Sequence, residues 1–196
     1  MKKLVVLFII FFTNVSFANI YINTPNFKPY IGINAGFNIA NYTVQIDDLD
    51  KEYVSATINA GARIGRNFGI ELFFSHSSTN SLDYIYDYYT VNHELYFQSL
   101  GFNIYGYYGI TSNFDFFTTF GVANYKIENT FDYFDTIVVT EEKKTFDNTS
   151  TRLGIGFMYT FPGDKVSMLV QYQYMPINTT FINNMSEFSI GARYTF

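Results

Sequence analysis

The chain contains no cysteine in its 196 residues, so it has no disulfide framework and no thiolate that could bind a metal or attack a substrate. Charged residues make up only 15% of the chain, whereas soluble domains usually carry about a quarter. The net charge of −5 argues against nucleic acid as a partner, because nucleic acid requires a basic surface. No apolar run reaches the roughly 18 residues of a transmembrane helix.

The first 18 residues have the organisation of an export signal. Two lysines precede the unbroken apolar run Leu4–Phe12, and small residues stand at Ser16 and Ala18, where cleavage is expected. As a helix this run would span only about 14 Å, half of a hydrocarbon core, which disfavours the alternative of a short membrane anchor. We predict a cleaved signal peptide over residues 1–18. Its removal takes away two lysines and changes the formal net charge from −5 to −7.

What the chain does have is alternation. Apolar residues alternate with small or polar ones in eight segments, which is typical of strands whose two faces meet different environments. The segment 114–122 is the least regular, because Phe117 falls among its polar positions, and Phe73 is a similar exception in an earlier segment. The eight predicted strands cover residues 31–39, 54–64, 68–75, 99–104, 114–122, 152–161, 166–174 and 188–196.

The links between these predicted strands alternate in length. Short links fall near 66–67, 111–113 and 162–165, and four long loops, which together carry most of the acidic residues, fall near 45–52, 78–92, 129–149 and 177–184. An even number of strands with short turns at one end and long loops at the other is typical of outer-membrane barrels. We predict an all-β fold, an eight-stranded antiparallel up-and-down transmembrane β-barrel over residues 29–196, preceded by a periplasmic segment over residues 19–28.

The composition of the two faces predicts which one meets lipid. A soluble β-sandwich also alternates, but its apolar face points inward and its polar face meets water. Here the second face is mostly glycine, serine, asparagine and threonine, which suit the narrow interior of an eight-stranded barrel. The aromatic residues, 21% of the chain, gather near both strand ends like two interfacial girdles. We therefore expect the large apolar residues to face lipid and the sheet to close, since backbone groups in lipid must all be paired.

Two stretches resemble a known family. Residues 61–72, with the sequence GARIGRNFGIEL, are similar to the second strand, turn and third strand of the small OmpA-like, opacity-protein and surface-antigen barrels of Gram-negative outer membranes. The ending FSIGARYTF resembles the signal that the barrel assembly machinery reads, with Phe196 last. The resemblance implies a location in the bacterial outer membrane and contact with the assembly machinery, outer-membrane lipid and lipopolysaccharide. It implies no shared catalytic site and no particular ligand.

Five charged residues fall on the predicted inward face, and each needs a partner, because an unpaired buried charge costs several kcal/mol. They are Arg63, Glu71 and Arg193 near the periplasmic end and Arg152 and Glu187 nearer the outside. A three-residue link over 66–68 would pair Gly65 with Gly69 and place Arg63 opposite Glu71. We interpret these charges as ion pairs that fix the strand register; a gate or ion path is the functional alternative.

Catalysis has one candidate. His76 and Ser78 share the outward face at the end of the predicted third strand, and a histidine beside a serine could activate it as a nucleophile. The lipid A deacylase family uses a His-x-Ser-Asn motif, but Thr79 stands here in place of its asparagine. His93 shows no metal-ligand spacing. We expect no enzyme, no cofactor and no metal site.

The long loops are the remaining candidates for function. Exposed tyrosine-rich loops on a rigid scaffold are a common way to build a binding surface. The possible surface consists of Tyr84, Tyr86, Tyr88 and Tyr89 in the second loop and Tyr133 and Phe134 in the third. Packing within the loops, or contact with lipopolysaccharide headgroups, would explain the same residues. We predict a structural or adhesive surface protein with a host or environmental ligand; the alternatives are a narrow pore and, third, a lipid-modifying enzyme.

Overall fold

The computed structural model describes residues 27–43, 51–85, 89–135, 139–179 and 182–196. The side chains of residues 82–93, 129 and 131–142 lie outside that description. The predicted signal peptide and most of the segment 19–28 also lie outside the described residues. No helix within the described ranges has the length and apolar character needed to cross a membrane.

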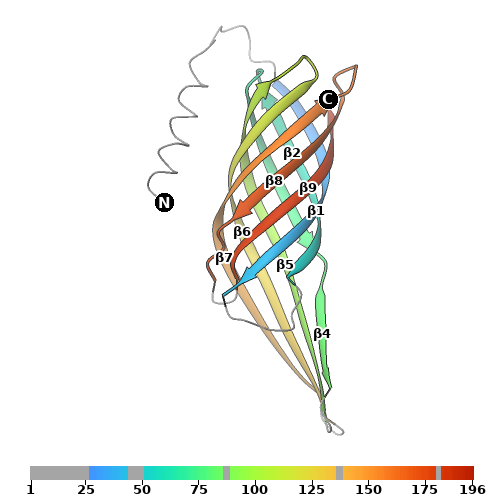
Figure 1. Ribbon diagram of the computed structural model, residues 1–196, viewed down its shortest axis with the longest axis vertical. Coiled ribbons are helices and arrows are strands. Elements are labelled where there is room, and N and C mark those ends of the chain that lie inside the picture. Colours follow the sequence, from blue (N-terminus) through green and yellow to red (C-terminus); the bar gives the residue numbers. More distant parts are fainter. Residues whose placement is uncertain (1–26, 44–50, 86–88, 136–138, 180–181) are drawn as a thin grey trace.

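The described residues form one closed antiparallel sheet (Figure 1). Its strands are β1 (Phe27–Tyr42), β2 (Glu52–Ile64), β3 (Phe68–Ser77), β4 (Asn80–Ile85), β5 (Tyr89–Gly109), β6 (Phe114–Asp135), β7 (Val139–Thr160), β8 (Val166–Met175) and β9 (Ile182–Thr195). Pairing of β1 with β9 and of β3 with β5 closes the barrel. Strand β4 follows β3 along the same edge of β5, so the barrel itself has eight strands. The predicted fold class is confirmed.

The two faces of the sheet point as the alternation predicts. Val54 and Ile58 are 60% and 62% exposed on the outer wall, whereas Asn59, the residue after Ile58, is 6% exposed. The outward face stays apolar for about eight to ten residues of each strand, close to the roughly 9–11 residues that a tilted strand needs to span a bilayer. On β5 and β6 it becomes polar at Gln98 and Asn124, which marks the loop-side edge of the apolar band.

The register between β2 and β3 differs from the predicted one by two residues. Ile64 pairs with Phe68, so Arg63 faces Gly69 and Gly61 faces Glu71, and the predicted cross-strand pair of Arg63 with Glu71 is wrong. The cause is Gly65, whose φ of 65° is a left-handed conformation that suits glycine and belongs to a turn. The turn therefore starts at residue 65, one position earlier than predicted.

Two of the four predicted loops are largely strand. Residues 80–85, 89–98, 124–135 and 139–151 extend β4, β5, β6 and β7 beyond the apolar band as a four-stranded sheet, seen at the bottom of Figure 1. From Asn124 to Asp135, β6 alone runs roughly 36 Å along its own direction. We call this extension the protruding sheet.

Candidate functional site

The barrel interior is not lined by small and polar residues alone. Two clusters of buried apolar side chains fill it toward its two ends. The turn-side cluster consists of Tyr105, Tyr107, Phe117, Met158 and Leu169. The loop-side cluster consists of Ala40, Tyr53, Phe73, Leu95, Phe97, Ala123, Tyr125, Ile127, Met175, Ile177, Ile182 and Met185. Phe73 and Phe117, the two exceptions to the alternation, were the signal in the sequence for these clusters.

Glu71 lies at the centre of the main polar network of the interior. It is 3% exposed, and its Oε2 lies 2.7 Å from Nη2 of Arg193, which is equally buried. The carboxylate also accepts hydrogen bonds from the Tyr105 hydroxyl (2.8 Å), the Tyr30 hydroxyl (3.1 Å) and the Asn103 amide (3.1 Å). Four donors from three strands thus converge on one carboxylate, which ties β1, β5 and β9 to β3 across the lumen.

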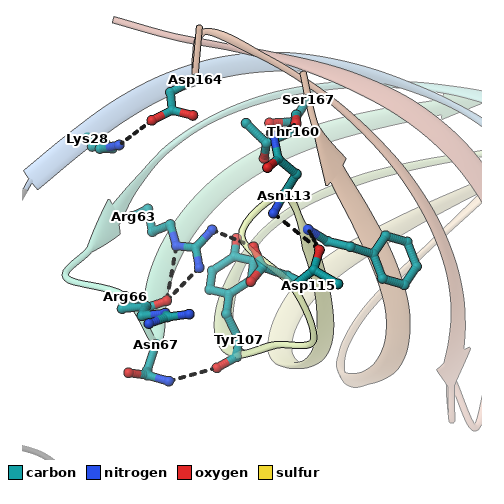
Figure 2. A network of polar contacts seen from close by, with 12 residues as sticks. Lys28, Arg63, Arg66, Asn67, Tyr107, Asn113, Asp115, Thr160, Asp164 and Ser167 are labelled. Carbon is teal, nitrogen blue, oxygen red and sulfur yellow. Dashed lines mark hydrogen bonds and ion pairs between the residues drawn. The ribbon is translucent and has the colours of Figure 1, made fainter. Parts of the chain in front are cut away.

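Arg63 has a different partner at the turn end of the barrel. Its Nη1 lies 2.7 Å from Oδ2 of Asp115, and its Nε and Nη2 donate to the Arg66 carbonyl at 3.1 and 2.6 Å (Figure 2). The guanidinium also lies over the Tyr107 ring, 4.3 Å from the centroid. Asp115 was not among the predicted interior charges, although it follows the turn and shares the inward face of β6. This arrangement joins the β2–β3 turn to β6, a strand that is adjacent to neither β2 nor β3 in the sheet.

Arg152 and Glu187 are buried at 3% and 4% exposure, deeper in the barrel. The Arg152 guanidinium donates to the Gln173 side-chain oxygen and lies 4.0 Å over the Phe73 ring. Gln173 in turn faces Glu187 across the β8–β9 ladder. Among the described contacts no direct ion pair joins Arg152 to Glu187.

A second polar cluster lies on the outer wall, just beyond the apolar band. The Glu128 carboxylate lies 2.5 Å from each of the Lys126 and Lys143 ammonium groups and accepts a hydrogen bond from the Tyr96 hydroxyl. These donors, Lys126 first, lower the pKa of the Glu128 carboxyl from 4.5 to about 2. The same contact raises the pKa of the Lys126 ammonium and of the Tyr96 hydroxyl. The carboxylate is covered by these three side chains and not by the protein interior, so the ion pairs are exposed to salt screening.

The candidate catalytic pair is not assembled in the described residues. The His76 ring packs against the Tyr96 ring, with centroids 5.6 Å apart. The Ser78 hydroxyl accepts a hydrogen bond from the Val54 backbone amide at 3.2 Å, and none of the contacts among the described residues joins it to His76. Within the described ranges, no group of three or more potential metal-ligating side chains comes together.

The predicted loop surface falls on the protruding sheet. The backbones of Tyr84, Tyr89, Tyr133 and Phe134 lie in paired strands, with Tyr84 facing Val91 and Tyr133 facing Val91 from the other side. Their side chains lie outside the description, as does the side chain of His93, and Tyr86 and Tyr88 lie outside the described residues altogether.

The geometry of a closed barrel with a lipid-width apolar band agrees with comparisons to known proteins. The family model of the outer membrane protein beta-barrel domain matches residues 4–196. The chain belongs to this family. The family and its structural neighbours place the protein in the bacterial outer membrane, and among curated proteins none matches the sequence.

Three solved structures share the fold. Neisserial surface protein A has 16% identity and a TM-score of 0.59, covering 86% of this chain and 97% of its own. Ail, the attachment invasion locus protein of Yersinia pestis, was solved in complex with the heparin analogue sucrose octasulfate; it has 15% identity and a TM-score of 0.56, covering 88% of this chain and 99% of its own. OprG from Pseudomonas aeruginosa has 10% identity and a TM-score of 0.55, covering 86% and 96%. Identities this low show the fold and no more.

Proposed function

We propose that this protein is a surface protein of the outer membrane that binds a partner outside the cell through its protruding sheet. The observation that carries the proposal is the length of β5, β6 and β7, which continue as a paired sheet far beyond the apolar band. In outer-membrane barrels the short turns face the periplasm, so the protruding sheet faces outward. A rigid sheet presents a binding surface at lower cost in ordering entropy than flexible loops of the same length.

The pairing pattern gives the protruding sheet an accessible side. Strand β7 pairs with β6 from Val139 to Tyr159 but with β8 only from Leu153 to Thr160. The sheet therefore stands away from β8 and β9 over most of its length. A partner that reaches the cell surface meets this sheet before it meets the barrel.

The likeness to Ail supports an attachment role, but the charge of this chain argues against a sulfated ligand. The four chain segments that join the apolar strands on the side of the long loops, residues 43–52, 76–98, 124–149 and 176–185, hold 13 acidic residues and four lysines in the sequence. A strongly negative end repels a polyanion such as the heparin analogue bound by Ail. We therefore expect adhesion that does not depend on heparin-like polysaccharide.

The experiment shortens the protruding sheet without disturbing the barrel. One variant replaces residues 129–144 with Asn-Gly, which closes a two-residue hairpin on the Glu128–Thr145 pair. A second variant replaces residues 81–94 in the same way on the Asn80–Leu95 pair. Non-adherent bacteria that express the full chain should adhere to cultured epithelial cells, and both variants should lose this adhesion. The matched control is Lys165→Gln in the turn at the opposite end, which should adhere like the full chain.

The outcomes separate the proposal from its alternatives. All variants should still migrate as folded barrels in unboiled detergent gels, which shows that assembly is intact. Adhesion that survives both truncations would overturn the proposal. Binding of the full chain to heparin beads would contradict the charge argument.

The two other functions have no supporting contact in the described part of the chain. A pore needs a continuous path, and the turn-side and loop-side clusters both lie across the lumen. We expect the protein to give no ion-conductance steps in a planar bilayer. We likewise expect Ser78→Ala to leave the lipid A of the expressing cell unchanged, since the Ser78 hydroxyl is engaged with β2.

A further inference from the structure

The two faces of the protruding sheet differ in composition, which becomes visible when its strands are aligned by their register. Residues that face each other across an antiparallel pair lie on the same face of a sheet. Leu95 and Phe97 on β5 and Ile127 on β6 are buried in the loop-side cluster, so their face continues the lumen side of the barrel wall beyond the mouth. We call it the mouth-side face. Three of its rows consist of Asn80, Leu95, Asn129 and Lys144; of Leu82, His93, Phe131 and Glu142; and of Tyr84, Val91, Tyr133 and Thr140.

The mouth-side face is largely apolar on β4, β5 and β6. The apolar and aromatic residues that continue it outward from Leu95 are Leu82, Tyr84, Val91, Phe131 and Tyr133. The positions of the opposite face include the acidic residues Asp83, Glu94, Asp132 and Glu141. A sheet buries an apolar face by packing it against another layer. All nine described strands belong to a single sheet, so none of them forms that layer.

The size of the mouth-side face suits a second sheet of the same kind. The protruding sheet beyond Phe97 and Ile127 has roughly 30 residues, and each residue of a sheet covers about 16 Å², or about 3.3 Å by 4.8 Å. One copy therefore presents about 500 Å², and two copies packed face to face bury about 1,000 Å² in total. Specific interfaces begin at about this area. A single pair is weak, but many pairs between two surfaces strengthen the binding through multivalency.

The position of this face over the barrel's own mouth determines from which side a second copy can approach. Packed sheets lie about 10 Å apart, so the second sheet must stand above the lumen of the first barrel. If both copies stood in one membrane, each sheet would hold its apolar face over its own lumen, and the two barrels would occupy the same space. A copy that projects from an opposing membrane meets no such obstacle, because its barrel lies beyond the tip of the first sheet.

Charge complementarity favours a second copy in this antiparallel arrangement. Two β7 strands that cross in opposite directions bring the row of Lys144 over the row of Glu142 in the other copy, and by symmetry the contact occurs twice. Of the acidic residues on the long-loop side, only Glu142 belongs to the three mouth-side rows. Asp83, Asp132 and Glu141 share a row of the opposite face, which is turned away from the contact and so reduces repulsion between two acidic ends.

We propose that the mouth-side face binds the mouth-side face of a second copy of this chain on an opposing cell, so that the protein links bacteria to one another. This inference rests on the proposed function, in which the protruding sheet is the outward binding element, and it names a partner for that sheet. Since β6 runs roughly 36 Å beyond the apolar band, the contact brings two outer membranes to about that distance. Long lipopolysaccharide chains on either cell prevent it.

A mixing experiment tests whether both surfaces must carry the chain. Bacteria without long O-polysaccharide that express the full chain carry one fluorescent label, and the same strain without the chain carries another. The expressing cells should sediment in aggregates that exclude the other label. Tyr133→Asp should abolish these aggregates. The matched control is Phe134→Asp, which adds the same charge at the next residue, on the opposite face, and should aggregate like the full chain.

A charge exchange tests the contact between the two copies directly. Glu142→Lys and Lys144→Glu each place like charges opposite one another, so cells that carry either variant alone should lose aggregation. A mixture of the two variants restores opposite charges across the contact and should aggregate like the full chain. A variant that merely failed to fold could not produce this recovery, and unboiled detergent gels check that every variant forms the barrel.

The outcomes separate this inference from the proposed function. Epithelial adhesion without aggregation of the expressing cells would overturn the second copy as partner and leave the proposed function standing, and aggregation without epithelial adhesion would do the reverse. Aggregates that include cells without the chain would also overturn the inference. Equal losses in Tyr133→Asp and Phe134→Asp would overturn the choice of face. No recovery in the mixture of charge variants would overturn the pairing of Glu142 with Lys144.

Discussion

Removing the Glu71 carboxylate is the sharpest perturbation that the interior offers. Glu71→Ala leaves Arg193 buried at 3% exposure with no counter-charge, and breaking a buried pair in this way costs about 3–5 kcal/mol. It also takes the acceptor from the hydroxyls of Tyr30 and Tyr105, at about 1 kcal/mol or more each. We therefore expect a loss near 5 kcal/mol. With an m-value of about 2 kcal/mol/M in urea, the unfolding midpoint falls by roughly 2 M.

The assay is urea unfolding of the refolded barrel in detergent, followed by the mobility difference between folded and unfolded chains in unboiled gels. Glu71→Gln keeps the shape and part of the hydrogen bonding, so its loss should be smaller than that of Glu71→Ala. The matched control is Asp164→Asn, which breaks the exposed 3.8 Å pair with Lys28 and should change stability by less than about 0.5 kcal/mol. A Glu71→Ala midpoint as close to wild type as that of Asp164→Asn would refute the reasoning.

Three further predictions use the same barrel. Asp115→Asn should cost about 1 kcal/mol in the same urea assay, less than Glu71→Ala, because the pair is partly exposed and Arg63 keeps its bonds to the Arg66 carbonyl. The pKa of the Glu128 carboxyl is lowered to about 2, so its contribution to folding is complete above pH 4.5 and is lost as the pH falls from 4.5 toward 2. The protection factors of the β6–β7 amides next to it, which correct for the intrinsic pH dependence of exchange, should fall over that range in wild type, and Glu128→Gln should abolish this fall. Gly101→Val should prevent or slow refolding, because a Cβ there lies 2.6 Å from the Phe73 ring, whereas Gly65→Ala has open space and should cost only about 1–2 kcal/mol for its left-handed φ.

The barrel could be predicted from the sequence because lipid and a narrow lumen select side chains so differently. Ile31, Ile33 and Phe37 are exposed on the outer wall of β1, while Asn34 and Asn38, each directly next to one of them in the chain, are buried. The sequence shows this contrast at every second residue of the strand. The segments 78–92 and 129–149 show no such regular contrast in the sequence, which therefore predicts loops there.

The interior could be predicted only in part. Tyr105 and Tyr107 occupy inward positions of β5 and are completely buried, yet tyrosines on a strand end equally suit an interfacial girdle. Parity along the strand favours the inside for them, whereas their aromatic character favours the outside. They lie inside because the lumen must be filled to the packing density of a protein interior. This constraint acts across the barrel and leaves no local pattern in the sequence.

The partner of each interior charge depends on space across the lumen as well as on neighbouring strands. Arg193 on β9 reaches Glu71 on β3 past β1 and β2, where Gly32 faces Arg193 and Gly61 faces Glu71. A Cβ at Gly61 would lie 2.7 Å from the Tyr30 ring, and a Cβ at Gly32 would lie 3.0 Å from Cγ of Arg193. Glycine at these two positions thus opens the path along which the long side chains cross. Because a neighbouring strand offers Arg193 and Glu71 each a glycine, these two charges do not pair with a cross-strand neighbour, and their ion pair forms between strands that are not adjacent.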